Sequence, residues 1–200
     1  MKNTLSFIWE IFKIVIIALV IVIPVRYFLF QPFLVNGQSM EPNFENGDYL
    51  IIDEISYRFH DPQRGEVIVF RAPPNPSTRY IKRIIGLPGE TIEIKEGKVF
   101  VIKENTEVLD ESAYLSSSVK TLVQSGPQKV TVPENSFFVL GDNRAVSSDS
   151  RTWGLLPREN IIGRVYLRLW PFKELGKIEK PIYPLKMKFL TGFTKIYNPI

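Results

Sequence analysis

The sequence predicts a mostly β protein, in which a single N-terminal transmembrane helix precedes an antiparallel β-sheet domain. One long apolar segment lies near the N-terminus, and eight short runs rich in Val, Ile, Phe and Tyr follow it. Gly, Pro and Asn separate these runs, as is typical of short strands joined by turns. No stretch after residue 31 has helical periodicity of comparable strength, so sheets are expected to build the core.

The apolar segment at residues 14–25 has twelve consecutive residues without a polar side chain. With its apolar flanks, residues 7–30 supply the roughly 20 residues that a membrane-spanning helix needs. A cleaved signal peptide is the alternative, but bulky residues follow the apolar segment in place of a small-residue cleavage site. We therefore expect residues 1–6 to be a short cytoplasmic N-terminus and residues 7–30 an uncleaved anchor.

The strand-like pattern covers residues 31–172, which we expect to form one domain. The predicted strands are 48–52, 66–70, 79–85, 91–95, 98–102, 129–132, 136–140 and 161–169. Glu96-Gly97 joins two of these strands and predicts a hairpin with a tight turn. Residues 104–126, which contain three consecutive serines, are predicted to form a looser insertion.

Residues 173–200 form a basic C-terminal tail. Its lysines exceed its glutamates by four, which equals the net charge of the whole chain, so residues 1–170 are formally neutral. The basic excess therefore does not predict a nucleic-acid-binding face on the β domain. The tail is either a surface appendage without a task of its own or a segment that rests on an anionic membrane.

Residue usage narrows the possible chemistry. The 200 residues include no cysteine and a single histidine, His60. These counts exclude a thiol nucleophile, a disulfide framework and a multi-histidine metal site. A Ser–His–Asp triad would have to use His60, so a hydrolase of this composition is expected to use a lysine or a carboxylate as its base. Neither a metal nor an organic cofactor is expected.

The first candidate segment, residues 35–42, places Ser39 in the short connection between the anchor and the first predicted strand. A serine in such a position is in most proteins only a loop residue. A nucleophile is, however, held well in a short loop on a rigid scaffold. The neighbouring Gly37 would let backbone N–H groups turn toward a developing oxyanion, so Ser39 is a candidate nucleophile.

The second candidate segment, residues 79–90, contains Lys82 between bulky apolar residues. On a strand, Tyr80 and Lys82 share one face, and Ile81 and Arg83 share the other. Lys82 either points to solvent at a strand edge or lies in an apolar pocket. In a pocket, burial would lower the pKa of its ammonium group and yield a neutral amine able to accept a proton from a serine.

The third candidate segment, residues 141–154, is a dense polar run that follows a predicted apolar strand. One interpretation is a solvated loop with an Asp149–Arg151 surface pair, which would contribute little stability. The other is a scaffold, in which a hydroxyl orients a neutral lysine and a carboxylate–guanidinium pair fixes the loop. The residues by themselves leave both interpretations open.

Together, these segments resemble the bacterial type I signal peptidase family of membrane-anchored Ser/Lys proteases. The resemblance covers roughly residues 10–172, in order and in spacing. After the anchor, the matching blocks are Gly-Gln-Ser-Met-Glu-Pro (37–42), Arg-Gly-Glu-Val-Ile-Val-Phe (64–70), Tyr-Ile-Lys-Arg-Ile-Ile-Gly-Leu-Pro-Gly-Glu (80–90), Gly-Asp-Asn-Arg (141–144) and Ser-x-Asp-Ser-Arg-x-Trp-Gly (147–154).

The resemblance implies a serine endopeptidase with Ser39 as nucleophile and Lys82 as general base. The hydroxyl of Ser147 would hydrogen-bond to the Lys82 amine, and the backbone N–H of Ser39 would supply one oxyanion donor. Some members carry Ser or Thr two residues before the nucleophile, where its hydroxyl completes the oxyanion hole. This chain has Gly37 there, so backbone or water would take that place.

The resemblance also assigns supporting roles in the third segment. Asp149 and Arg151 match the structural ion pair of the family, and Asp142 matches the aspartate that helps to hold the site. Where the family has Arg-Asp-Asn, this chain has Arg144-Ala145-Val146, so two polar side chains are absent.

Substrate-binding positions are implied for five residues. Phe33, Val35, Tyr80 and Ile81 match the family's lining of the small pockets for the −1 and −3 side chains, and Met40 would border the cleft. Such pockets imply cleavage after Ala-x-Ala sequences. The implied partners are the signal peptides of exported preproteins and membrane lipid, and no nucleic acid. The implied location is the cytoplasmic membrane, with a single span and the catalytic domain on the extracytoplasmic side.

Three alternatives remain beside this reading. A relative could process one dedicated substrate rather than exported proteins in general. A non-enzymatic membrane-tethered β module would explain the composition, but not the joint presence of the three candidate segments. A Ser/Lys self-cleaving transcriptional regulator would need a DNA-binding domain, and no helix-turn-helix pattern precedes Ser39.

Overall fold

The structure is a computed structural model that describes residues 2–28 and 30–183. Leu29 of the predicted anchor and residues 184–200 of the predicted tail lie outside the described residues. The helical elements are α1 (Lys2–Phe28), η1 (Ser56–Arg58), α2 (Ser150–Trp153), η2 (Arg158–Asn160) and η3 (Phe172–Glu174). The strands are β1 (Phe30–Leu34), β2 (Tyr49–Asp53), β3 (Val67–Ala72), β4 (Asn75–Gly86), β5 (Thr91–Lys95), β6 (Lys98–Ile102), β7 (Thr106–Val108), β8 (Lys129–Thr131), β9 (Ser136–Leu140), β10 (Leu156–Pro157), β11 (Ile161–Trp170) and β12 (Gly176–Lys177).

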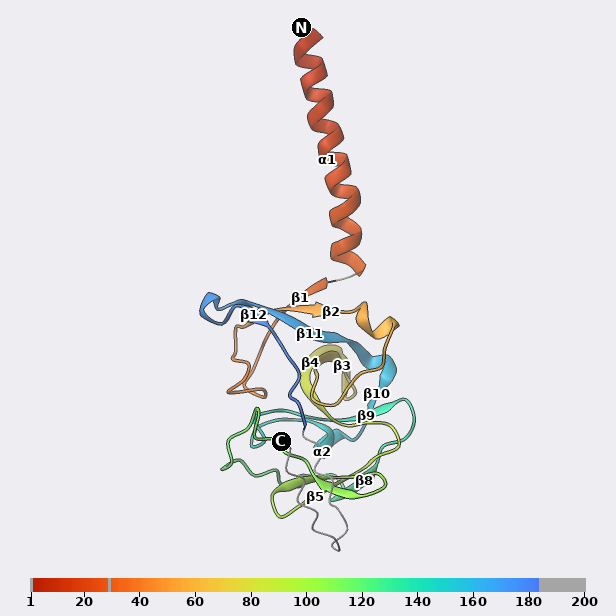
Figure 1. The fold of residues 1–200 in the computed structure, drawn as a ribbon, viewed down its shortest axis with the longest axis vertical. Helices are drawn as coiled ribbons and strands as arrows, with labels where there is room; N and C mark the ends of the chain where they lie inside the picture. The colour runs from red at the N-terminus through yellow and green to blue at the C-terminus, as the bar shows by residue number, and fades with distance from the viewer. Residues whose placement is uncertain (1, 29, 184–200) are drawn as a thin grey trace, which may run out of the picture.

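The helix α1 extends away from the β domain (Figure 1). It is 27 residues long and begins at Lys2, so it includes most of the segment expected to precede the anchor. The side chains of residues 6–20 are all exposed, including those of Phe7, Trp9 and Ile14. Among the residues that the structure describes, no helix is both long enough and apolar enough to qualify as a membrane span.

The larger sheet has the strand order β1-β2-β11-β3-β4-β9-β10, and β12 pairs with β11. Each step from β1 to β4 is antiparallel, so these two strands run in the same direction. Within the described part of the chain, β1 pairs only with β2, and β9 pairs with β4 only from Arg83 onward. The free edge of β1 and the free edge of residues 75–82 in β4 line one cleft between them, which we call the seam.

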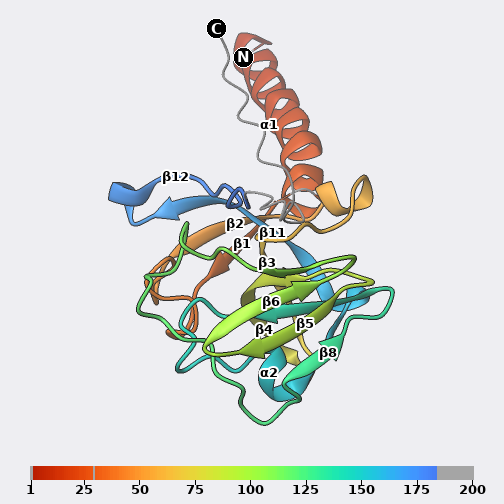
Figure 2. The same ribbon diagram turned by 60° about the horizontal axis from the view of Figure 1, so that its bottom comes forward.

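The smaller sheet has the order β7-β6-β5-β8, and it forms a separate layer that lies below the larger sheet in Figure 1 and in front of it in Figure 2. The predicted hairpin is confirmed, because β5 and β6 pair up to Lys95 and Lys98. The two turn residues, Glu96 and Gly97, both have positive φ angles, as the tightest hairpin turns require.

The eight predicted strands are all present, and three of them, 91–95, 98–102 and 136–140, have the observed bounds. Among the residues that the structure describes, the sequence did not predict four further strands: β1, β7, β10 and β12. β1 contains Pro32 and directly follows the apolar helix, so its pattern is not that of a strand. The other three have only two or three residues, which is too short for a visible alternation.

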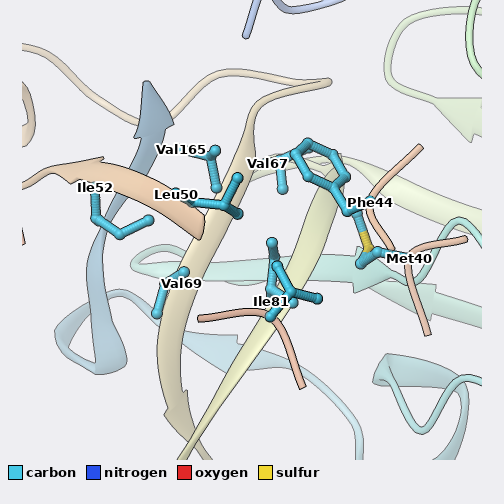
Figure 3. Packing of buried hydrophobic residues seen from close by; sticks show 9 residues of the cluster. Met40, Phe44, Leu50, Ile52, Val67, Val69, Ile81 and Val165 are labelled. Atoms are coloured by element: carbon cyan, nitrogen blue, oxygen red, sulfur yellow. The ribbon is translucent and has the colours of Figure 1, made fainter. Parts of the chain in front are cut away.

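Three apolar clusters form the core. The first joins residues from the β1–β2 region, β3, β4 and β11, and Figure 3 shows its members Met40, Phe44, Leu50, Ile52, Val67, Val69, Ile81 and Val165. Because successive side chains of a strand point to opposite faces, β3 sends Val67 and Val69 into this cluster and Ile68 and Phe70 into the second. The third cluster joins the two sheets through residues such as Ile85, Ile92 and Phe138. Burial on both faces makes β3 and residues 81–86 of β4 rigid supports for nearby side chains.

The insertion and the start of the tail are more integrated than the sequence suggested. Residues 104–126 include β7 and buried Tyr114 and Leu115. In the tail, β12 pairs with β11 and Ile178 packs against the first apolar cluster. The described part of the tail, up to Tyr183, is therefore part of the domain rather than an appendage.

Candidate active site

Ser39 lies in the loop between β1 and β2, which short backbone hydrogen bonds hold in place. Val35 N–H donates to the Asp48 carbonyl at 2.9 Å, and Gly47 N–H donates to the Val35 carbonyl at 2.9 Å. Gly37 has a φ of +97°, a conformation that a residue with a Cβ rarely adopts. Its N–H donates to Asn46 Oδ1 at 2.8 Å, so that N–H fixes the loop instead of facing a bound substrate.

Lys82 lies on β4 and reaches across the seam to Ser39. Its Nζ donates to Ser39 Oγ at 2.7 Å and to the Ile81 carbonyl at 2.9 Å. The residue is only 3% exposed, so the alternative of a solvent-facing lysine is wrong. Burial lowers the pKa of its ammonium group from 10.5 to about 8, against the opposing attraction of Asp149 and Asp142. A substantial fraction of the side chain is therefore a neutral amine near pH 8.

The loop after β9 packs directly against the Ser39 loop. Asn143 N–H donates to the Ser39 carbonyl at 3.0 Å. A Cβ at Gly141 would overlap with Ser147 Oγ and with the Ser39 carbonyl oxygen, so the two loops touch at that point. The absence of a side chain at position 141 is therefore a condition for this contact.

Ser147 is buried beside this contact, but its hydroxyl does not make the predicted hydrogen bond. Its Oγ has no hydrogen-bond partner among the described residues, and the Lys82 amine contacts Ser39 and Ile81 instead. Ser147 lies close to Gly141 and so to the nucleophile loop, but the hydrogen bond to Lys82 that the resemblance implied is absent from this structure. The spacing of residues along the chain does not reveal which partner a buried hydroxyl finds.

Asp142 holds the two sides of the site together through Arg83. Its carboxylate accepts from Arg83 Nε at 2.8 Å and Nη2 at 2.6 Å, and from Asn43 Nδ2 at 2.9 Å. Arg83 also donates to the Gly65 carbonyl, and its guanidinium lies 4.1 Å from the centre of the Tyr114 ring. Since Arg83 directly follows Lys82 on β4, this buried pair anchors the strand that carries the amine.

Asp149 and Arg151 form a buried pair, so the interpretation as a solvated surface pair is wrong. Arg151 Nε and Nη2 donate to the two oxygens of Asp149 at 2.8 and 2.7 Å, and both side chains are almost fully buried. Asp149 also accepts from the backbone N–H of Gly141 at 3.1 Å and caps α2 through Arg151 N–H. The pair thus fixes both ends of the loop that contacts Ser39.

Sequence reasoning missed a third buried pair, which ties the insertion to the same loop. Arg144 donates to both carboxylate oxygens of Glu111, to Thr121 Oγ1 and to the Gly141 carbonyl. The signal available in the sequence was a charged residue inside the third candidate segment, but nothing in the spacing identified Glu111 as its partner. The insertion is therefore a structural part of the site.

A cleft of about 410 Å³ opens along the seam beside Ser39 and Lys82. The residues that line it are Phe33, Leu34, Asn36, Gly37, Gln38, Ser39, Arg79, Tyr80, Ile81, Lys82, Val146 and Ser148. Three of the five predicted substrate-binding residues, Phe33, Tyr80 and Ile81, are among them. Val35 and Met40 are not, because their side chains are buried in the first apolar cluster. They support the cleft through Phe33 and Ile81, which contact both the cleft and that cluster.

His60 lies away from the cleft. Its Nδ1 is 3.4 Å from the Asp61 carbonyl oxygen, and its ring packs edge-on against Tyr57. In the described part of the chain, no three His, Cys, Asp or Glu side chains are grouped so that they could hold a metal ion. The site as it stands pairs a hydroxyl with a buried amine, which is an arrangement for nucleophilic acyl transfer.

Comparisons with known proteins agree on one family. The family model described as signal peptidase, peptidase S26, matches residues 8–170. The chain is 42% identical over 176 residues to signal peptidase I of Leptolyngbya laminosa, covering 84% of this chain and 83% of that protein. It is 34% identical over 168 residues to signal peptidase IB of Staphylococcus aureus, covering 79% of this chain and 87% of that protein. Among solved structures, the chain is similar to the crystal structure of a signal peptidase I from Enterococcus faecalis V583, with 34% sequence identity and a TM-score of 0.43. The match covers 53% of this chain and 97% of the Enterococcus chain.

Proposed function

The chain belongs to the signal peptidase family, peptidase S26, and from this membership we propose that it removes signal peptides with a Ser39–Lys82 dyad. The observation that carries the proposal is the 2.7 Å contact between Lys82 Nζ and Ser39 Oγ, made by an amine whose pKa burial has lowered to about 8. A hydroxyl and a neutral amine at this distance are placed for direct proton transfer.

In the acylation step, the neutral Lys82 amine accepts the proton of Ser39 Oγ while Oγ attacks the carbonyl carbon of the scissile bond. The resulting ammonium group gives this proton to the departing amide nitrogen, and the C–N bond breaks. A water molecule then attacks the acyl-enzyme, passes a proton to Lys82, and releases the signal peptide with a free carboxylate. The proton finally returns to Ser39 Oγ, so the enzyme is regenerated.

The backbone N–H of Ser39 is our candidate for one oxyanion donor, because it belongs to the residue under attack. The Gly37 N–H is already engaged with Asn46, so it is not the second donor. Gly37 leaves the space beside Ser39 open, since no atom lies within 4 Å of the position of a Cβ there. A water molecule in this space is the donor we propose.

The substrate is proposed to bind as an extra strand in the seam. The edges of β1 and of residues 75–82 in β4 run in the same direction, and a peptide between them can hydrogen-bond to either edge. Phe33 and Ile81 contribute bulky side chains to this part of the cleft. Bulky walls leave room only for small side chains, which supports cleavage after Ala-x-Ala sequences.

We also propose that α1 anchors the enzyme in the cytoplasmic membrane, with the β domain on the extracytoplasmic side. The proposal rests on the twelve-residue apolar run and on the exposure of every side chain described from residue 6 to residue 20. Exposed apolar side chains on this scale are costly in water but favourable in lipid. This side of the membrane is where precursors emerge.

The test is cleavage of a precursor with an Ala-x-Ala site by the detergent-purified full-length chain. The wild type should cut after the final Ala, and Ser39→Ala and Lys82→Ala should each lose at least about a thousandfold in kcat/KM. Lys95→Ala, at an exposed hairpin position, is the matched control and should cut normally. Because only the neutral amine accepts a proton, kcat/KM should rise with pH and level off above about 8.

A folded wild type that cuts no such precursor would contradict the proposal. A second experiment, with a panel of unrelated precursors, distinguishes a general peptidase from one dedicated to a single substrate. Cleavage of most of the panel supports the general role, and cleavage of one member supports the dedicated one.

A further inference from the structure

The cleft continues past the apolar residues to Arg79, at the end of the seam away from Ser39. Arg79 lines the cleft and is exposed, and its Nη1 donates to Gln31 Oε1 on β1 at 3.2 Å. This hydrogen bond crosses the seam from β4 to β1. A peptide strand that fills the seam must therefore pass beside it or replace it.

The surroundings of Arg79 are positively charged. Arg71 is its direct partner on β3, so the two side chains lie on the same face of the sheet. The carboxylate of Glu54 is close enough to interact electrostatically with Arg79, Arg58 and Arg71, and its Oε1 is buried without a hydrogen-bond partner among the described residues. Three guanidinium groups thus face a single carboxylate, which leaves this end of the cleft attractive to an anion.

The position along the strand indicates which substrate residue meets Arg79. Arg79 precedes Lys82 by three residues, which corresponds to about 10 Å along a strand. In the proposed binding mode, the −1 and −3 side chains lie beside Ser39 and near Tyr80 and Ile81, so the upstream part of the peptide runs toward Arg79. The residue four or five positions before the cut bond would lie beside its guanidinium group.

We propose that Arg79, held by Gln31, is a specificity-determining residue that favours an acidic side chain at the fourth or fifth position before the cut bond and disfavours a basic one. This inference rests on the proposed peptidase function and adds a charge preference to its choice of small residues. It concerns the peptide rather than lipid, because Arg79 lines the same cleft as Ser39 and Lys82.

The experiment uses the full-length chain in neutral detergent and three precursors that differ only at positions −4 and −5, which carry Asp, Asn or Lys. The readout is the ratio of kcat/KM for the Asp and Lys precursors. In the wild type we expect the Asp precursor to be favoured roughly fivefold, as for an exposed ion pair. Arg79→Glu should reverse the preference, and Arg79→Lys should keep its direction.

Two further measurements sharpen the comparison. Lys95→Glu makes the same charge change on the smaller sheet, and it should leave the ratio at the wild-type value. At about 1 M salt the wild-type ratio should approach one, because salt screens exposed charges.

An equal ratio in the wild type and in Arg79→Glu, with cleavage intact, would overturn this inference alone. An Arg79→Glu effect that is equal for all three precursors and requires anionic phosphatidylglycerol vesicles would also overturn it, because Arg79 would then face lipid. If the folded wild type cuts none of the three, the proposed function itself fails, and the inference fails with it.

Discussion

At the scale of single residues, the site depends on a lysine kept in an unfavourable environment. Burial lowers the pKa of Lys82 from 10.5 to about 8, so the unfolded chain binds the proton more tightly than the folded one. Below pH 8 Lys82 is charged in both the folded and the unfolded chain. The full free-energy cost of burying its charge, roughly 3 kcal/mol, then opposes folding. Between about pH 8 and 10.5 this cost declines, and stability rises with pH.

Lys82→Met is therefore expected to abolish cleavage and to stabilise the fold by about 1–3 kcal/mol at pH 7, since it removes a buried charge while keeping the chain length. Urea unfolding at a series of pH values measures the effect, which should shrink as the pH rises from 8 toward 10.5. Lys95→Met, at an exposed position, is the control and should change stability by less than about 0.5 kcal/mol. A Lys82→Met variant less stable than the wild type at pH 7 would contradict this account.

Gly141 is the second residue of this kind, because its surroundings leave no space for a side chain. Gly141→Ala places a methyl group onto Ser147 Oγ and the Ser39 carbonyl, so the nucleophile loop must shift. Because small displacements of a nucleophile reduce its rate strongly, kcat/KM should fall at least about tenfold. Gly176→Ala, where no atom lies within 4 Å of the added Cβ, should stay within about twofold of the wild type. Wild-type activity in Gly141→Ala would show that the two loops are not in contact.

At the scale of elements, two buried ion pairs connect segments that are distant in the sequence, and a third closes the loop that these two pairs share. Arg83–Asp142 joins β4 to the loop after β9, Asp149–Arg151 closes that loop, and Arg144–Glu111 attaches the insertion to it. The β12 segment adds a further attachment, because Ile178 packs on the first apolar cluster. Removing one partner of such a contact therefore affects several elements together.

Ile178→Ala should lower the free energy of unfolding by about 1–2 kcal/mol, because it removes a partly buried side chain from the first apolar cluster. Ile182→Ala is a matched control in the same segment, since Ile182 is 89% exposed, and should cost less than about 0.5 kcal/mol. Thermal or urea unfolding of the two variants measures the difference. Equal values would mean that the segment from β12 onward is not part of the folded domain.

At the scale of the whole molecule, α1 and the β domain are expected to have different roles. The helix extends from the domain (Figure 1), while the three apolar clusters, the ion pairs and the cleft all lie within the β domain. The stability of the domain is therefore expected to be independent of α1, and contact with the membrane to depend on it.

Deletion of residues 2–28 should leave the Tm of the β domain within about 3 °C of the full-length value, because the core clusters lie outside α1. The same deletion should abolish flotation with lipid vesicles. Differential scanning calorimetry and a vesicle flotation assay measure the two effects, with the full-length chain as the reference. A truncated chain that fails to unfold cooperatively would show that α1 is part of the core.

The sequence by itself determined the mostly β, antiparallel character of the domain and its eight predicted strands, and it singled out Ser39 and Lys82 as candidates. Alternating apolar residues, turn residues and ordered local segments are properties of neighbouring positions, so they are visible without a structure. It also identified Asp149 and Arg151, two residues apart, as an ion pair, although it did not show whether the pair is buried or exposed.

Only the tertiary structure decided how distant segments meet. It buried Lys82 and lowered its pKa, paired Arg144 with Glu111, placed Val35 and Met40 in the core rather than in the cleft, and left Ser147 without its expected contact. Burial, partner choice and side-chain rotation depend on segments that approach one another in space. The spacing of residues along one chain does not contain that information.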